Sequence, residues 1–205
     1  MIKNIVFDLG HVLIQFPWRE CMKKAGIKEE DIERVASATV NSPYWGENDR
    51  GVIRDDELLE KFISLAPDKA KEITDFVNTI TEFMGPFDYS YSWLKSLKDR
   101  GYNIYILSNF SDTNFNKLKP SYTFLELADG MVISYLYKCV KPEREIYDLL
   151  LNKYSLTAEE CVFIDDREDN IEAALSRGMY GIVFKSYDDA NGKLQTLLSE
   201  KGIFG

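Results

Sequence analysis

The chain has 205 residues, of which 45% are hydrophobic and 29% are charged, and its formal net charge is −9. This balance is typical of a globular protein, and the length suits either one large domain or a core that carries a smaller insert. Because no run of Lys or Arg stands out in this acidic chain, we expect neither nucleic acid nor an anionic membrane surface as a partner.

The cysteines and the N-terminal segment indicate a cytoplasmic protein. The three cysteines are odd in number and none forms a Cys-x-x-Cys pair, so we expect buried thiols in a reducing compartment rather than disulfides or a zinc site. Asp8 interrupts the apolar start of the chain and no small-residue cleavage site follows, so we expect no signal peptide. No stretch approaches the length of a membrane-spanning helix. The sequence allows a monomer or a homodimer.

The chain begins with a short apolar run, residues 2–7, which predicts a buried β-strand. The next stretch contains no convincing strand and several helical patterns. The longest is an amphipathic stripe from Ala70 to Phe83, and Asp55 is a candidate N-cap of an earlier helix. We therefore expect a helical domain, residues 15–87, inserted after the first strand.

The rest of the chain alternates between strand and helix patterns. Short apolar runs predict four more strands, at residues 103–107, 131–133, 161–164 and 180–184. Gly101 and Gly178 are well placed to end two of the intervening helices. This alternation predicts an α/β fold, a Rossmann-like three-layer core with a mostly parallel sheet, formed by residues 1–14 and 88–205.

Polar side chains follow three of the predicted strands. Ligands of an open parallel sheet bind beyond the carboxyl ends of its strands, so residues at these positions are candidates for a functional site. They are Asp8 after the first strand, Ser108 and Asn109 after the second, Lys141 before the helix that follows the third, and Asp165, Asp166 and Asn170 after the fourth.

This set of residues predicts the hydrolysis of a small phosphorylated substrate. Converging carboxylates usually hold a cation, and oxygen ligands favour a hard ion such as Mg²⁺. Mg²⁺, Lys141 and the Ser108 hydroxyl would neutralise the charge on the phosphoryl oxygens. Asp8 would then attack the phosphorus to form an aspartyl-phosphate, which water hydrolyses. The cation also explains how an acidic protein could hold an anion.

Four segments resemble, in the same order, the motifs of the haloacid dehalogenase-like (HAD) hydrolases: VFDLGHVL, ILSNFS, VKPEREIY and FIDDREDN. The resemblance covers nearly the whole predicted core. It implies that Asp8 is the nucleophile, that the Ser108 hydroxyl binds phosphate, and that Lys141 contacts both. It also implies that Asp166 binds magnesium with the support of Asp165 and Asn170, and that the helical insert is a mobile cap of the C1 type.

Gly10 departs from the pattern of this family. Many of its phosphatases carry an Asp two residues after the nucleophile as a general acid/base, a role worth about 10²–10⁴ in rate. Gly10 can offer only its backbone carbonyl to the metal. The FDLG form also resembles a subgroup of sugar-phosphate phosphatases that includes α-D-glucose-1-phosphate phosphatases. A sugar phosphate with a good leaving group is therefore the expected substrate.

Several other polar and aromatic residues have local explanations. His11, the only histidine, is expected to pack in a loop, with replacement of the missing acid/base as the alternative hypothesis. Asp169 is expected to be a solvated carboxylate in the first turn of a helix. Trp45 and the Asp49-Arg50-Gly51 turn are expected in the core or at the rim of the cap, with substrate contact as the alternative.

Three other functions remain open. A metal-independent haloacid dehalogenase would also use Asp8, but it would leave the acidic FIDDREDN segment unexplained. A non-catalytic module that binds phosphate ligands would account for Gly10, but not for the presence of Asp8, Lys141 and Asp166 together. A sugar-phosphate mutase would depend on the acid/base assistance that Gly10 cannot give.

Overall fold

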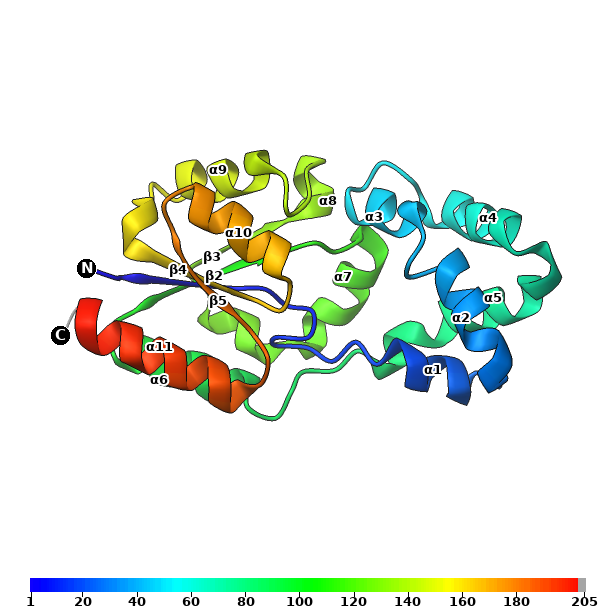
Figure 1. Cartoon of the computed structure of the whole chain (residues 1–205), viewed down its shortest axis with the longest axis horizontal. Coiled ribbons are helices and arrows are strands. Elements are labelled where there is room, and N and C mark those ends of the chain that lie inside the picture. Colours follow the sequence, from blue (N-terminus) through cyan, green and yellow to red (C-terminus); the bar gives the residue numbers. More distant parts are fainter. Residues whose placement is uncertain (203–205) are drawn as a thin grey trace.

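The computed structural model describes residues 1–202 of the chain. Five parallel strands form its central sheet, in the order β3-β2-β1-β4-β5 (Figure 1). They are β1 (Asn4–Phe7), β2 (Asn103–Ser108), β3 (Gly130–Ile133), β4 (Cys161–Asp165) and β5 (Tyr180–Val183). Every residue of β1 and β4 is buried, because helices cover both faces of a parallel sheet of this kind. The predicted α/β fold and its mostly parallel sheet are confirmed.

Helices on both faces of the sheet complete the three layers of the core. α9 and α10 lie over one face, and α6 and α11 lie over the other (Figure 1). The core helices are α6 (Ser90–Asp99), α7 (Asp112–Leu118), α8 (Ser134–Tyr137), α9 (Arg144–Lys153), α10 (Glu168–Ser176) and α11 (Tyr187–Lys201). Gly101 and Gly178 follow α6 and α10 with φ of 86° and 83°, which confirms the prediction that they end these helices.

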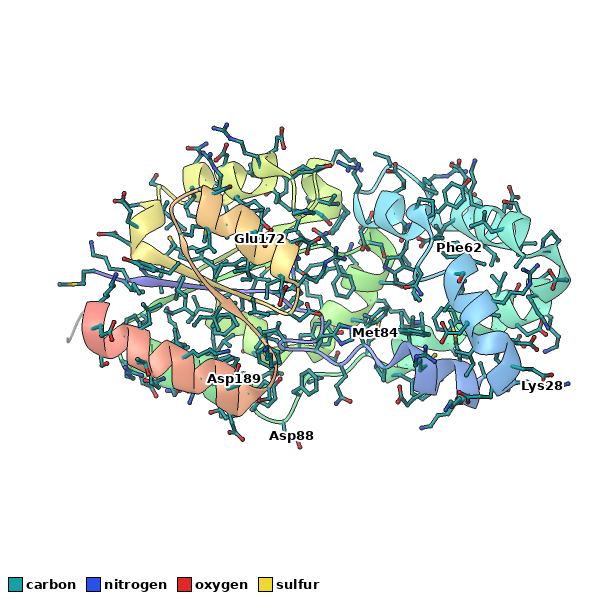
Figure 2. The ribbon with its side chains drawn as sticks, viewed as in Figure 1. Lys28, Phe62, Met84, Asp88, Glu172 and Asp189 are labelled. Atoms are coloured by element: carbon teal, nitrogen blue, oxygen red, sulfur yellow. The ribbon has the colours of Figure 1, made fainter. Side chains whose placement is uncertain are left out.

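A separate group of helices lies beside the sheet (Figure 1). Its members are α1 (Trp18–Lys24), α2 (Glu29–Ala38), α3 (Pro43–Asp49), α4 (Asp55–Leu65) and α5 (Ala70–Thr79). The apolar stripe that starts at Ala70 runs through α5 and continues in a short 3₁₀ helix, Ile80–Phe83. Figure 2 shows Phe62 within this group and Met84 between the group and the core, and both side chains are buried.

The predicted N-cap of α4 is wrong. Asp55 is the first residue of the helix and Arg54 occupies the cap position. The Asp55 carboxylate instead accepts a hydrogen bond of 3.1 Å from the Asn48 side chain in the preceding helix. This tertiary contact replaces the local capping bond, and the helix begins one residue earlier than an N-cap at Asp55 would place it.

The carboxyl ends of the strands face the helical group, and the N-terminus and the end of α11 lie on the opposite side of the core (Figure 1). α3 contacts α8 at this junction. The cysteines are free, with Cys21 and Cys161 buried and Cys139 half-buried. Within residues 1–202, no helix combines the length and the apolar composition needed to cross a membrane.

Candidate active site

The two central strands of the sheet bring Asp8 and Asp165 to the same level. β1 and β4 are hydrogen-bonded neighbours, and Phe7 pairs with Ile164 in their register. Asp8 directly follows Phe7 and Asp165 directly follows Ile164, so the two carboxylates meet at the carboxyl edge of the sheet. Asp166 follows directly. The predicted convergence of strand-end carboxylates therefore follows from the strand order and register.

The Lys141 ammonium group lies between Asp8 and Asp165. Its Nζ is 2.7 Å from Asp8 Oδ1 and 2.6 Å from Asp165 Oδ2. All three side chains are buried, with Lys141 5% and Asp165 0% exposed. A buried charge is costly unless it is paired, so this cation offsets part of the repulsion between the two carboxylates.

Asp165 is held by further hydrogen bonds within its own loop. The Arg167 backbone N–H donates to Oδ1 at 2.9 Å. The Asn170 side-chain amide donates to both carboxylate oxygens, at 2.9 and 3.1 Å. The Asp165 carboxylate accepts hydrogen bonds from these donors and from Lys141, which fix the orientation of its side chain. This agrees with the supporting role predicted for Asp165 and Asn170.

Burial dominates the electrostatics of the site. It raises the pKa of Asp8 to about 7 against the opposing effect of Lys141, and the neighbouring Asp165 and Asp166 charges add to the rise. The pKa of Asp166 is also raised, by burial and by Asp165. Burial alone would lower the pKa of Lys141, but Asp165 and Asp8 together raise it above its ordinary value. The site therefore has an excess of negative charge even with Lys141 protonated.

The carboxylates of Asp8, Asp165 and Asp166 could bind a metal ion. One ligand oxygen from each lies within 4.8 Å of the others. Oxygen donors of this kind suit Mg²⁺, which usually takes one or two carboxylates and completes its shell with waters and phosphate. Asp165 is already bound by Lys141 and Asn170, so Asp8 and Asp166 are the residues best able to hold the ion. Gly10 lies on the wall of the same cavity.

A cavity of about 410 Å³ opens above these carboxylates. Six of the predicted site residues line it: Asp8, Gly10, Asn109, Lys141, Asp166 and Asn170. Asp165 and Ser108 do not line it, and Ser108 is only 1% exposed. The phosphate-binding role predicted for the Ser108 hydroxyl therefore stays a prediction.

Asn109 connects the second strand to the lysine loop. Its side-chain amide donates to the Lys141 carbonyl at 3.0 Å, and its Oδ1 accepts from the Lys141 backbone N–H at 2.8 Å. These two bonds fix the backbone from which the Lys141 side chain extends. Asn109 therefore positions Lys141 as well as lining the cavity, a role that sequence reasoning did not assign.

Sequence reasoning also missed Ser111. This residue is 1% exposed, lines the cavity, and has a hydroxyl without a hydrogen-bond partner in the described part of the chain. Buried hydroxyl groups are normally paired. Ser111 ends the ILSNFS segment, which was the available sequence signal.

The helical group contributes a second wall to the cavity. Trp18, Val40, Trp45 and Asp49 lie on this wall. Trp45 is stacked against the buried Phe62, with ring centroids 6.2 Å apart, in keeping with its expected place in the core or at the rim of the helical group. Its contact with a substrate stays a prediction. Arg50, by contrast, does not line the cavity, because its guanidinium pairs with Glu143 of the core.

His11 and Asp169 occupy the positions expected from local structure. His11 is exposed, has a φ of 57°, and packs edge-on against Phe16 with ring centroids 5.6 Å apart. It lies on the wall of the cavity, near enough to Asp166 to oppose part of the rise in the pKa of that carboxyl. Asp169 is paired with Arg167 at 2.6 Å, and both side chains are largely exposed.

Fold and site together are those of an enzyme with an α/β core and an aspartate at the end of its central strand. Residues 2–178 match the family model of the haloacid dehalogenase-like hydrolases, and the chain belongs to this family. The predicted family, and the prediction that the chain is a hydrolase, are confirmed.

Named relatives within the family include phosphatases. The chain is 28% identical over 180 residues to a sesquiterpene phosphatase of Aspergillus oryzae, covering 88% of each chain. It is 23% identical over 205 residues to the D-ribitol-5-phosphate phosphatase of Bacteroides thetaiotaomicron, covering 94% of each chain. A HAD family enzyme from Bacteroides thetaiotaomicron, solved in complex with magnesium and inorganic phosphate, has a TM-score of 0.74 at 23% identity and covers 94% of this chain and 99% of its own.

Proposed function

We propose that the protein is a Mg²⁺-dependent phosphatase that hydrolyses a small phosphorylated metabolite through an aspartyl-phosphate on Asp8. One observation carries this proposal: the Asp8 carboxylate is at the floor of a cavity, 2.7 Å from a buried lysine and beside two further carboxylates. A hydrolase family with phosphatases among its members supplies the context.

The donor set fits Mg²⁺. Asp8 and Asp166 would hold the ion, with Asp165 behind them and Gly10 able to offer its carbonyl. When bound, the ion would neutralise charge on the phosphoryl oxygens of the substrate. The site's excess of negative charge gives the physical reason to expect a cation there.

The residues of the chain have distinct parts in the proposed reaction. An Asp8 oxygen attacks the phosphorus and the bond from phosphorus to the ester oxygen breaks, which gives the aspartyl-phosphate. Lys141 orients Asp8 and attracts the transferred phosphoryl group, while Asn109 holds the Lys141 backbone. Water then attacks the phosphorus and releases inorganic phosphate, which restores the Asp8 carboxylate.

We further propose that residues 15–87 form a cap and that residues 1–14 and 88–205 form the catalytic core. The cavity wall contributed by Trp18, Trp45 and Asp49 supports this division, since these side chains would contact the organic part of a substrate. Closure of such a cap would exclude water from the aspartyl-phosphate until the alcohol has left.

A sugar phosphate is the first candidate substrate, in keeping with the FDLG form and with the named alditol-phosphate relative. A second candidate is the phosphate of an apolar alcohol. Its support is the cavity lining, which includes the apolar side chains of Ile14, Phe16, Trp18, Val40, Trp45, Met84 and Phe110. Such a lining would bury the apolar groups of a substrate favourably. The named sesquiterpene phosphatase relative points the same way.

Phosphate release from a panel of esters tests the proposal. The panel holds α-D-glucose 1-phosphate, D-ribitol 5-phosphate, the monophosphate of a sesquiterpene alcohol and nucleoside monophosphates, each with Mg²⁺ and with a chelator. We expect Mg²⁺-dependent release that is lost in Asp8→Asn and kept in Asp88→Asn, an exposed control of the same chemistry.

Two other outcomes would contradict the proposal, and a third would choose between its two candidate substrates. Tight binding of phosphate esters with no turnover would favour a binding module. Release of chloride from a 2-chloro acid without metal would favour a dehalogenase. Preference for the sesquiterpene ester over both sugar esters would decide for the apolar substrate class.

A further inference from the structure

The proposed phosphatase lacks an acid beside its nucleophile. Gly10 stands where a carboxyl group could protonate the departing alcohol, and it has no side chain. An unassisted alkoxide is a poor leaving group, so the reaction needs a proton donor elsewhere in the cavity. This inference rests on the proposed function.

Asp49, the last residue of α3, lies on the cavity wall contributed by the helical group. Its carboxyl group takes part in no hydrogen bond or ion pair among the described residues. Asp8 and Lys141 line the same cavity, and theirs are the charges that act on the Asp49 carboxyl most strongly. An unpaired carboxyl group in this position is available to a substrate.

The core holds the backbone of Asp49 in place. The Ser134 hydroxyl donates to the Asp49 carbonyl at 2.5 Å and accepts from the Phe110 backbone N–H at 3.0 Å. The next residue, Arg50, forms a bidentate pair with Glu143 and donates to the Lys138 carbonyl. Asp49 is thus fixed relative to the core even though it belongs to α3.

We propose that Asp49 is the general acid and base of the reaction. In the first step the Asp8 carboxylate forms a bond to phosphorus while the bond from phosphorus to the ester oxygen breaks. The protonated carboxyl of Asp49 gives its proton to that departing ester oxygen. In the second step the Asp49 carboxylate takes a proton from water as the water oxygen attacks phosphorus and the bond to Asp8 breaks. The proton lost in the first step is regained in the second, so the enzyme returns to its starting state.

The electrostatic setting agrees with this role. Burial raises the pKa of Asp49 to about 7; the Asp8 charge adds to this rise and the Lys141 charge opposes it. The protonated and the ionised carboxyl therefore both exist near neutral pH. The other charged groups on the cavity wall are Asp166, Arg167 and His11. The adjacent Arg50 is paired with Glu143, and the cation that acts on Asp49 is Lys141.

Dependence on the leaving group tests the proposal. Nitrophenolate departs without protonation, whereas an alkoxide does not. In Asp49→Asn we expect kcat/KM for the best alkyl phosphate of the panel to fall by about 10²–10⁴, and kcat/KM for p-nitrophenyl phosphate to fall by less than about tenfold. The variant should also release a burst of nitrophenolate before a slow steady state, because loss of the base slows hydrolysis of the aspartyl-phosphate.

Two matched variants sharpen the result. Asp56→Asn removes an exposed carboxylate from the helical group and controls for the change in charge. His11→Asn removes the other candidate acid on the cavity wall. Equal loss on both esters in Asp49→Asn, or a selective loss in His11→Asn instead, would overturn the role of Asp49 and leave the phosphatase intact. No phosphate release by the wild-type enzyme would overturn the proposed function and, with it, this inference.

Discussion

Asn109 and Lys141 are 32 residues apart in the chain, yet the Asn109 side chain forms two hydrogen bonds with the Lys141 backbone. Asn109 follows β2, and Lys141 precedes α9. The pair therefore joins two loops at the carboxyl edge of the sheet and sets the point from which the Lys141 ammonium reaches Asp8 and Asp165.

Asn109→Ala removes both bonds and leaves the Lys141 N–H and carbonyl without these partners. We expect a loss of about 1–3 kcal/mol in the free energy of unfolding, together with a fall in kcat because Lys141 is less well oriented. Urea unfolding and steady-state kinetics measure the two effects. Asn109→Asp keeps the acceptor and should retain more stability than Ala; an Ala variant with wild-type kcat would contradict the positioning role.

Lys141→Met leaves Asp8 and Asp165 buried without their cation. Breaking a buried pair in this way costs about 3–5 kcal/mol. In the variant the pKa of Asp8 loses the lowering effect of Lys141 and rises further above its unfolded value, so the unfolded state binds fewer protons than the folded state and stability falls as pH rises. We therefore expect a larger loss at about pH 8 than at about pH 5.5 by urea unfolding.

Lys95→Met is the matched control for this experiment. Lys95 pairs with Asp99 on the surface of α6, and both side chains are about half exposed. Its removal should change stability by no more than about 0.5 kcal/mol at either pH. A Lys141→Met variant that behaved like this control would show that the carboxylates do not depend on the lysine.

The Arg50–Glu143 pair holds the end of α3 against the core, and both side chains are only partly exposed. Arg50→Ala and Glu143→Ala should each lower kcat/KM on alkyl phosphates, because both loosen the backbone beside Asp49. The double variant should lose little more than either single one, with a coupling energy above about 0.5 kcal/mol. Strictly additive losses in this double-mutant cycle would mean that the two residues act separately.

Ionisation of Asp49 should set the pH at which kcat/KM of the wild-type enzyme declines. The raised pKa of Asp49 keeps the carboxyl protonated below about pH 7, so kcat/KM on alkyl phosphates should have an alkaline limb that declines as pH rises through that value. Protonation of the nucleophile Asp8, whose pKa is also raised to about 7, limits activity on the acid side. Asp49→Asn should lose the alkaline limb. If kcat/KM falls with the same apparent pKa in both proteins, another group is responsible for the decline.

Gly10→Asp offers a rescue of Asp49→Asn. A side chain added at Gly10 meets nothing nearer than Asp8 Oδ2, at 4.0 Å from its Cβ, so the position has room for a carboxyl group next to the nucleophile. We expect the double variant to regain activity on alkyl phosphates relative to Asp49→Asn. Gly10→Ala in the same background adds a side chain without an acid and should restore nothing.

The sequence determined the class of fold and the identity of the chemical groups. Short apolar runs separated by helical patterns require a covered parallel sheet, and polar residues after such runs must meet at its carboxyl edge. Asp8, Lys141 and Asp166 were predicted on this basis, and the structure brings them together. Gly10 showed, from the sequence alone, that an acid was missing.

Only the tertiary structure decided which residues complete the cavity. Asp49 lies 41 positions after Asp8 in the sequence, on a helix with no motif, and only the packing of α3 against α8 brings it to the cavity. Trp18 and Trp45 also line the cavity only through tertiary packing. In the sequence, their spacing from other apolar residues is the same as in any helix that packs in a core. Local patterns report which face of a helix is apolar, whereas the contact of that face with a site depends on long-range packing.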